Sequence, residues 1–267
     1  MLTEGPGGPF DGRPLPEGRP PPVLVGGVGE LYQGDLDIGR AAVERLLGEP
    51  LGDGVLVEDL HYGAVAVCQR LEELRPAHLV LVGGVVRNRP PGTVERRRPD
   101  LSNLTPAVAQ QAVGDAVTGY VSIDILVEVA AGLGALPPRT VCIEVEPASL
   151  ALSDQLSAEG RAGLEEALAM VRTEVALVPL LDLAAQIGVR CREDAERLGD
   201  APAVHTLGQL VRSIQVLGEE GRWGRIYAQR EQLRRQIDSG ETGEGMDFLD
   251  WALLWSLLEE LDRFVVS

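Results

Sequence analysis

Residues 23–39, VLVGGVGELYQGDLDIG, decide the fold of this chain. The stretch opens with an apolar run that is typical of a buried β-strand. Gly27 and Gly29 then mark a tight turn, and an acidic loop leads into a helical pattern that begins near Ile38. A strand, a glycine turn and a helix in this order predict the first βα unit of a parallel sheet.

The same alternation continues to about residue 175. Further strands are predicted at residues 55–57, 78–86, 92–97 and 140–145, with 92–97 as an edge strand. Helices are predicted at residues 38–47, 64–74, 116–133 and 158–175. The strands are continuous apolar runs, which indicates that helices cover both faces of the sheet. We therefore predict a three-layer α/β/α fold with a mostly parallel sheet.

The regions on either side of this core differ from it in composition. Residues 1–22 are rich in Gly and Pro and are predicted to form a flexible tail, so the α/β domain spans residues 23–178. Residues 179–267 are predicted to be an all-helical C-terminal extension, with helices at 180–187, 206–217, 223–237 and 246–264. In the last helix, Trp251 and Trp255 lie on an apolar stripe with helical spacing. This stripe either packs within the chain or forms a docking face for a partner protein.

Composition disfavours several classes of function. The chain has 267 residues, a formal charge of -17 and 24 basic residues, all of them arginines. An acidic protein repels phosphate backbones, so nucleic-acid binding is not expected. The arginines at residues 96–98 are predicted to be a solvated strand end. A secretion signal and a bilayer-spanning apolar run are both lacking, so we expect a cytoplasmic protein without membrane insertion.

The cysteines also limit the possible chemistry. Cys68, Cys142 and Cys191 lie far apart and form no CxxC pair. This spacing favours neither a zinc ribbon nor a disulfide framework. Cys68 and Cys142 fall within apolar runs and are predicted to be buried.

Five pieces of the sequence resemble, in order, the nickel–iron hydrogenase maturation endopeptidases. They are the turn and helix start at residues 27–39, the strand 78–86 followed by Pro-Gly-Thr-Val at 91–94, the helix 124–131 with Leu136-Pro137, the strand 140–145, and Pro-Ala-Ser-Leu at 147–150. Together they span about residues 23–172. The resemblance implies an α/β/α fold and an endopeptidase that trims a hydrogenase large subunit after recognising its nickel.

The same resemblance places the nickel ligands of the family at three positions. The family uses a carboxylate in its acidic loop, an Asp at the end of the third strand and a His before the long helix. This chain has Leu36, Gly83 and Gly119 at those positions. We therefore expect a catalytically degenerate protein without a cofactor, which acts as a binding or assembly module for a hydrogenase-like partner.

An alternative is an active endopeptidase with a rearranged nickel site. Asp35, Asp37 and His61 follow the first two strands, whose ends face the same crevice in a parallel sheet. Simpler roles also exist, with Asp35 as a helix N-cap, Asp37 in a positive first helical turn and His61 as a loop residue. A further alternative is a structural or regulatory protein unrelated to hydrogenase.

Two more acidic positions are candidates for the crevice. Glu30 follows the glycine turn, and Glu146 alternates with Glu144 at the end of the last strand, where one of the two faces the crevice or both are solvated. Gly27 and Gly29 also match part of a dinucleotide-binding fingerprint. However, the third glycine position is Tyr32 and the acidic loop would repel phosphate, which disfavours nucleotide binding.

Overall fold

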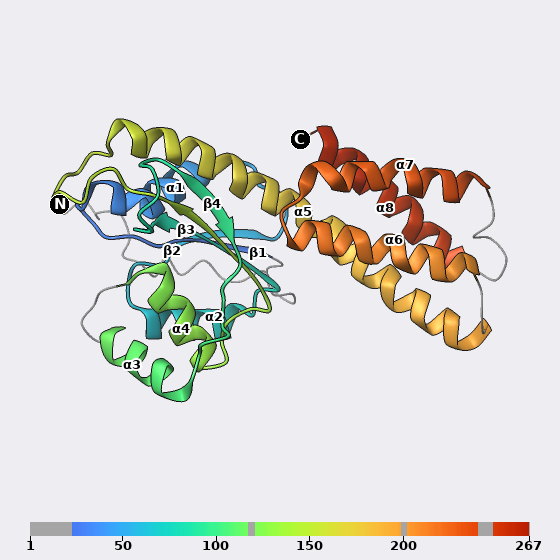
Figure 1. Ribbon diagram of the computed structural model, residues 1–267, viewed down its shortest axis with the longest axis horizontal. Coiled ribbons are helices and arrows are strands. Elements are labelled where there is room, and N and C mark those ends of the chain that lie inside the picture. Colours follow the sequence, from blue (N-terminus) through green and yellow to red (C-terminus); the bar gives the residue numbers. More distant parts are fainter. Residues whose placement is uncertain (1–22, 117–120, 199–201, 240–247, 267) are drawn as a thin grey trace, which may run out of the picture. The chain divides into compact units, whose positions relative to one another are not determined.

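The computed structural model describes residues 23–116, 121–198, 202–239 and 248–266. The chain divides into two compact units, Met1–Val175 and Ala176–Ser267. In the described residues, the first unit holds a five-stranded sheet with helices and the second is helical (Figure 1).

The sheet has the strand order β2-β1-β3-β5-β4. The strands are β1 (Val23–Gly27), β2 (Val55–Asp59), β3 (His78–Gly84), β4 (Val94–Arg97) and β5 (Arg139–Val145). β1 pairs in parallel with β2 and β3, and β3 pairs in parallel with β5, whereas β4 runs antiparallel to β5 at the edge. The predicted fold class and the predicted edge strand are both confirmed.

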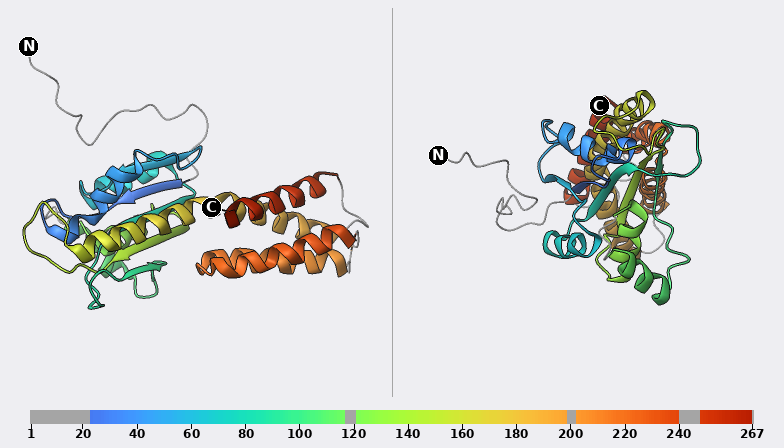
Figure 2. Two further views of the ribbon diagram at one scale, coloured as in Figure 1. Left: turned by 90° about the horizontal axis from the view of Figure 1, so that it is seen from above. Right: turned by 90° about the vertical axis from the view of Figure 1, so that its left-hand side faces the viewer.

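Helices cover both faces of this sheet, which explains why its central strands are continuous apolar runs (Figures 1 and 2). On one side lie α1 (Ile38–Leu46) and the first part of α5 (Ala158–Leu198). On the other lie α2 (Ala64–Leu74), α3 (Pro106–Ala116) and α4 (Ile123–Gly132), which share a buried core with β1 and β3. Cys68 and Cys142 are buried as predicted, and burial raises the pKa of the Cys142 thiol to about 12.

The prediction of a single helix at residues 116–133 is wrong. Two helices, α3 and α4, occupy this region, and residues 117–120 between them lie outside the described residues. Ser122 caps the second helix, because its side-chain oxygen accepts a hydrogen bond of 3.2 Å from the backbone N–H of Ile125. α3 was not predicted from the sequence. Most of its described side chains are exposed, so it lacks the apolar stripe that indicates a helix.

The prediction of separate helices at 158–175 and 180–187 is also wrong. α5 runs continuously through Pro179, and the boundary between the two units falls within it. A proline in a helix interior removes one backbone hydrogen bond and costs about 3 kcal/mol. Here the flanking residues Leu177 and Leu180 are buried in the apolar core of the second unit, which offsets that cost.

The second unit is helical, as predicted. It contains the rest of α5 with α6 (Pro202–Glu219), α7 (Trp223–Ser239) and α8 (Phe248–Val266), and these helices run alongside one another (Figure 2). Along α8, Leu254, Leu258 and Leu261 are buried in the core of this unit, whereas Trp255 is 49% exposed. The side chain of Trp251 lies outside the described residues. Among the described helices, none is long and apolar enough to cross a membrane.

Candidate functional site

The candidate site lies at the carboxyl end of the parallel strands, where the loops after β1, β3 and β5 meet. After β1, the chain turns at Leu31–Tyr32, not at the predicted Gly27–Gly29, and passes through the short 3-10 helix η1 (Gly34–Asp37) into α1. A Cβ atom on Gly39 would overlap the backbone of Val28, so this glycine lets the start of α1 pack directly on the strand end. The sequence motif at residues 27–39 therefore has a packing explanation independent of catalysis.

The loop after β1 also crosses the end of β3 at very short range. A Cβ atom on Gly83 would overlap the carbonyl oxygen of Val28, and one on Gly84 would overlap that of Asp35. At Leu36, the backbone carbonyl accepts a hydrogen bond of 3.1 Å from the N–H of Glu30. Leu36 and Gly83, the two described positions that the sequence resemblance assigns to nickel ligands, carry no ligating side chain, and Gly83 has no room for one. Gly119 lies outside the described residues.

Asp35 is fully buried and anchors the loop after β5. Its carboxylate accepts hydrogen bonds from the backbone N–H groups of Ala148 at 2.8 Å, Ser149 at 3.2 Å and Ser157 at 2.7 Å. The hydroxyl of Ser157 donates a fourth bond of 2.7 Å. Asp35 therefore does not act as a helix N-cap, as one prediction held, but fastens residues 148–157 to the loop after β1.

These contacts change the acidity of Asp35. Burial raises the pKa of its carboxyl group, but the hydrogen bonds from Ser157, Ala148 and Ser149 lower it more, and the pKa lies below the ordinary value of 3.8. The start of α5 is close by, because a Cβ atom on Gly160 would overlap the Asp35 carboxylate. The positive end of that helix dipole also favours the charged form of Asp35.

Replacing Asp35 with asparagine is expected to lower the free energy of unfolding by about 1–3 kcal/mol near pH 7, because hydrogen bonds to a charged acceptor are lost. The folded-state pKa of Asp35 lies below its unfolded value of 3.8, so its contribution is complete above that pH and is lost as the pH falls through the folded pKa. Urea unfolding at about pH 7 and about pH 3 should therefore show a larger loss of stability on acidification in the wild type than in Asp35→Asn. Equal losses in both proteins would contradict the assigned role.

The other residues of the predicted rearranged nickel site have separate partners. Asp37 is buried and is held by Arg40, with N–O distances of 2.6–3.0 Å. His61 places its Nδ1 atom 2.6 Å from a carboxylate oxygen of Asp59. In the described part of the chain, no three His, Cys, Asp or Glu side chains gather as a set that could hold a metal ion. The convergence of Asp35, Asp37 and His61 is therefore not observed.

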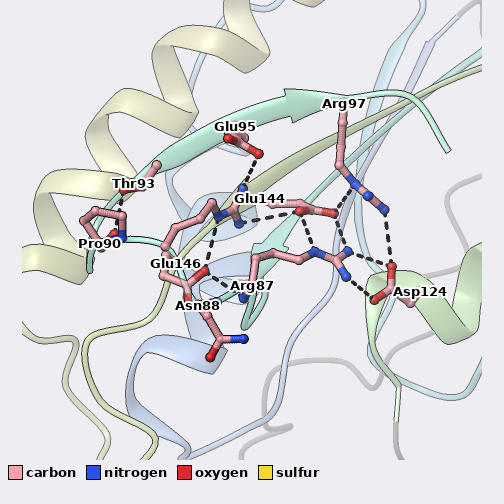
Figure 3. A network of polar contacts seen from close by, with 10 residues as sticks. Arg87, Asn88, Pro90, Thr93, Glu95, Arg97, Asp124, Glu144 and Glu146 are labelled. Atoms are coloured by element: carbon pink, nitrogen blue, oxygen red, sulfur yellow. Dashed lines mark hydrogen bonds and ion pairs between the residues drawn. The ribbon is translucent and has the colours of Figure 1, made fainter. Parts of the chain in front are cut away.

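Glu144 and Glu146 form the centre of a buried ionic network, and the prediction that they are solvated is wrong. Glu144 has 0% exposure and Glu146 has 4%. Glu144 accepts hydrogen bonds from Arg87 at 2.7 and 3.0 Å and from Arg97 at 2.8 Å (Figure 3). The guanidinium of Arg87 also binds Asp124 at the start of α4.

Glu146 holds the turn that follows β3. It accepts hydrogen bonds from the backbone N–H groups of Arg87 at 2.8 Å and Asn88 at 3.1 Å, and from the side chain of Arg89 at 3.2 Å. Burial raises the pKa of Glu146, but these bonds lower it more, so the pKa lies below the ordinary value of 4.5. The pKa of the Arg87 guanidinium is raised by its bonds to Glu144 and Asp124. Oppositely charged groups thus surround both glutamates.

The arginines predicted to be a solvated strand end belong partly to the interior. The side chain of Arg96 is 11% exposed and pairs with Glu174 of α5 at 2.5 Å. Arg97 joins the Glu144 network, and Arg98 lies 3.5 Å from the carbonyl oxygen of Pro138. Since β4 lies at the sheet edge beside β5, these arginines fasten the edge strand to its neighbours.

Solved structures that resemble the chain include several hydrogenase maturation peptidases. A hydrogenase 2 maturation peptidase from a Thaumarchaeota archaeon is 28% identical, with a TM-score of 0.41, over 56% of this chain and 94% of its own. The hydrogenase maturating endopeptidase HybD from Escherichia coli is 27% identical, with a TM-score of 0.42, over 56% of this chain and 88% of its own. The maturation protease HycI from Thermococcus kodakarensis is 18% identical, with a TM-score of 0.43, over 61% of this chain and 94% of its own.

No protein-family model matches the chain, and no curated protein matches it. The chain resembles the hydrogenase maturation peptidases both in the motifs of its sequence and in these structural matches. That resemblance concerns a little over half of the chain.

Proposed function

We propose that this chain is a hydrogenase maturation protease-like protein without peptidase activity, which binds a hydrogenase-like subunit or an assembly factor. The observation that supports this proposal most strongly is the crowding at Gly83, where the carbonyl oxygen of Val28 takes the space of a side chain. A ligand could not be restored at this position without moving the loop after β1. The loss of the ligand is therefore built into the packing of the site.

Nickel is cargo of the substrate in the class of protein that the chain resembles, and the residues present here do not fit it. A divalent nickel ion is well matched by imidazole and carboxylate ligands. Asp37 is held by Arg40, whereas His61 contacts Asp59 through Nδ1, which leaves its Nε2 as a single available ligand atom. Asp35 already accepts four hydrogen bonds. A rearranged nickel site would have to break the contacts of Asp35 and Asp37, because His61 alone supplies one ligand, and this supports the non-catalytic alternative.

What remains at this end of the sheet is a rigid scaffold for binding. Glu146 fixes the turn after β3, and Asp35 fixes the loop after β5. Loops that are ordered before association lose less conformational entropy when a partner binds. A fold that no longer needs its catalytic groups can keep this surface for recognition, since function depends on the site and not on the fold alone.

The test is to mix the purified chain with the precursor of a nickel–iron hydrogenase large subunit from the same host, loaded with nickel. We expect a complex on size-exclusion chromatography and an unchanged precursor mass by intact mass spectrometry. Precursor without nickel serves as the matched control and should bind equally well, because no nickel ligands remain. Shortening of the precursor would overturn the loss of activity, and absence of a complex would overturn the hydrogenase partner.

A further inference from the structure

The loops after β1 and β5 are joined by a short stretch of parallel backbone pairing. Gln33 and Ser153 form a parallel bridge. The N–H of Gly34 donates to the carbonyl of Ser153 at 3.0 Å, and the N–H of Ser153 donates to the carbonyl of Tyr32 at 2.9 Å. In a parallel pair, the residues preceding the bridge lie next to each other, which places Tyr32 beside Leu152.

Four large apolar side chains on these joined loops are exposed. The exposed fractions are 45% for Leu31, 67% for Tyr32, 54% for Leu150 and 84% for Leu152. We call these four residues the loop patch. Single exposed apolar residues are common, but a group held together by backbone pairing indicates an interaction site. Leu150 and Leu152 lie in the segment that Asp35 fastens to the loop after β1. The backbone of this part of the patch is therefore held in place before a partner binds.

The backbone at Tyr32 is strained, and the exposed ring gains little burial in return. Its φ angle is +62°, in the left-handed region that a bulky side chain rarely adopts. Glycine or asparagine would accept this conformation at lower cost. Strained residues of this kind cluster at functional sites, so the conformation of Tyr32 independently supports a binding role for this loop.

Two negatively charged side chains beside the loop patch indicate that its partner carries positive charge. Glu30 precedes Leu31 and Asp154 follows Ser153, and within the described residues no ion pair is formed by either carboxylate. We propose that the loop patch binds a segment of a partner protein that carries apolar side chains together with Lys or Arg. This proposal rests on the proposed function, because it specifies where the partner binds and with which chemistry. Burial of apolar side chains would supply the binding free energy, and the two carboxylates would select positive charge.

The first test uses defined peptides and the full chain. A short peptide of alternating Leu and Lys is compared with a Leu–Glu peptide and a Ser–Lys peptide of equal length, by fluorescence anisotropy. The Leu–Lys peptide should bind at least about tenfold more tightly than either control. In NMR spectra, its addition should shift the amide signals of residues 31–32 and 150–152. Equal binding of all three peptides, or shifts confined to other residues, would overturn the proposal.

The second test uses variants of the patch. Tyr32→Asn should weaken binding of the Leu–Lys peptide several-fold while its urea midpoint stays equal to or above that of the wild type, because backbone strain is relieved. Leu152→Ser should also weaken binding. The matched control is Leu47→Ser, since Leu47 is 61% exposed at the C-terminal end of α1, away from the carboxyl end of the sheet. Unchanged affinity in both patch variants would overturn the proposal.

The patch and the proposed function can fail separately. If the hydrogenase precursor binds the wild type and the patch variants equally well, the loop patch is not the binding site, whereas the hydrogenase partner is supported. If the precursor does not bind but the Leu–Lys peptide binds at residues 31–32 and 150–152, the patch stands and its partner is another protein. Loss of precursor binding in Tyr32→Asn and Leu152→Ser, but not in Leu47→Ser, would support both.

Discussion

Glu144→Gln is expected to lower the free energy of unfolding of the first unit by about 3–5 kcal/mol, as when one member of a buried ion pair is removed. Glu144 is fully buried and is bonded to Arg87 and Arg97. Glutamine keeps the shape but not the charge, so both guanidinium groups lose their shared counter-ion. The positive charge that remains is incompletely paired in a poorly solvated region.

Urea unfolding should be followed by far-UV circular dichroism, because all three tryptophans lie in the second unit and their fluorescence reports on that unit. The matched control is Glu165→Gln, which breaks the pair of Glu165 with Arg45, whose side chains are 58% and 53% exposed. Such a surface pair contributes about 0–1 kcal/mol. If the two variants lose equal stability, the Glu144 network does not hold the sheet edge as described.

The second large effect is expected for Gly83→Asp, which restores the residue type that the family resemblance places there. We expect a loss of more than about 3 kcal/mol, because overpacking a closed site costs about 1–3 kcal/mol and a buried carboxylate without partners adds to it. The loop at Val28 must move before the new Cβ atom fits. Nickel binding should therefore not return with this substitution.

Gly114→Asp is the matched control for the same change of residue. A Cβ atom on Gly114 meets nothing within 4 Å. The free energy of unfolding of the Gly114→Asp variant should therefore differ from that of the wild type by less than about 1 kcal/mol. Urea midpoints of the two variants measure the difference. A stable, nickel-binding Gly83→Asp protein would show that the loop is adaptable and that the ligand position remains usable.

Much of the first unit could be predicted because its central strands, β1, β3 and β5, are buried on both faces. The apolar runs at β1, β3 and β5 follow directly from that burial, and the alternating residues of β4 mark an edge. α3 could not be found in this way, since its exposed side chains leave no periodic stripe. The passage of α5 through Pro179 depends on packing in the second unit, which no local pattern reveals.

At the candidate site, the sequence resemblance predicts which ligands are missing but not which contacts the remaining charged residues make. The alternation of Glu144 and Glu146 was visible, yet their partners come from the turn after β3 and from an antiparallel edge strand. Only the order β3-β5-β4 brings these groups together. The available signal is the group of arginines at residues 87–98 near a predicted sheet edge, of which residues 96–98 are predicted to be solvated. A local helix cap was one of the two roles predicted for Asp35, although its hydrogen bonds reach residues 148–157.

The most direct measurement of the central claim is a calorimetric titration of the purified chain with nickel, beside an Asp37→Asn/His61→Ala variant. These two substitutions leave Asp35 and its structural bonds intact. Our account predicts no stoichiometric binding to either protein, because Asp37, Glu144 and Asp35 are held by arginines and backbone N–H groups. Stoichiometric nickel binding by the wild type that is lost in the variant would contradict it and would establish a rearranged metal site.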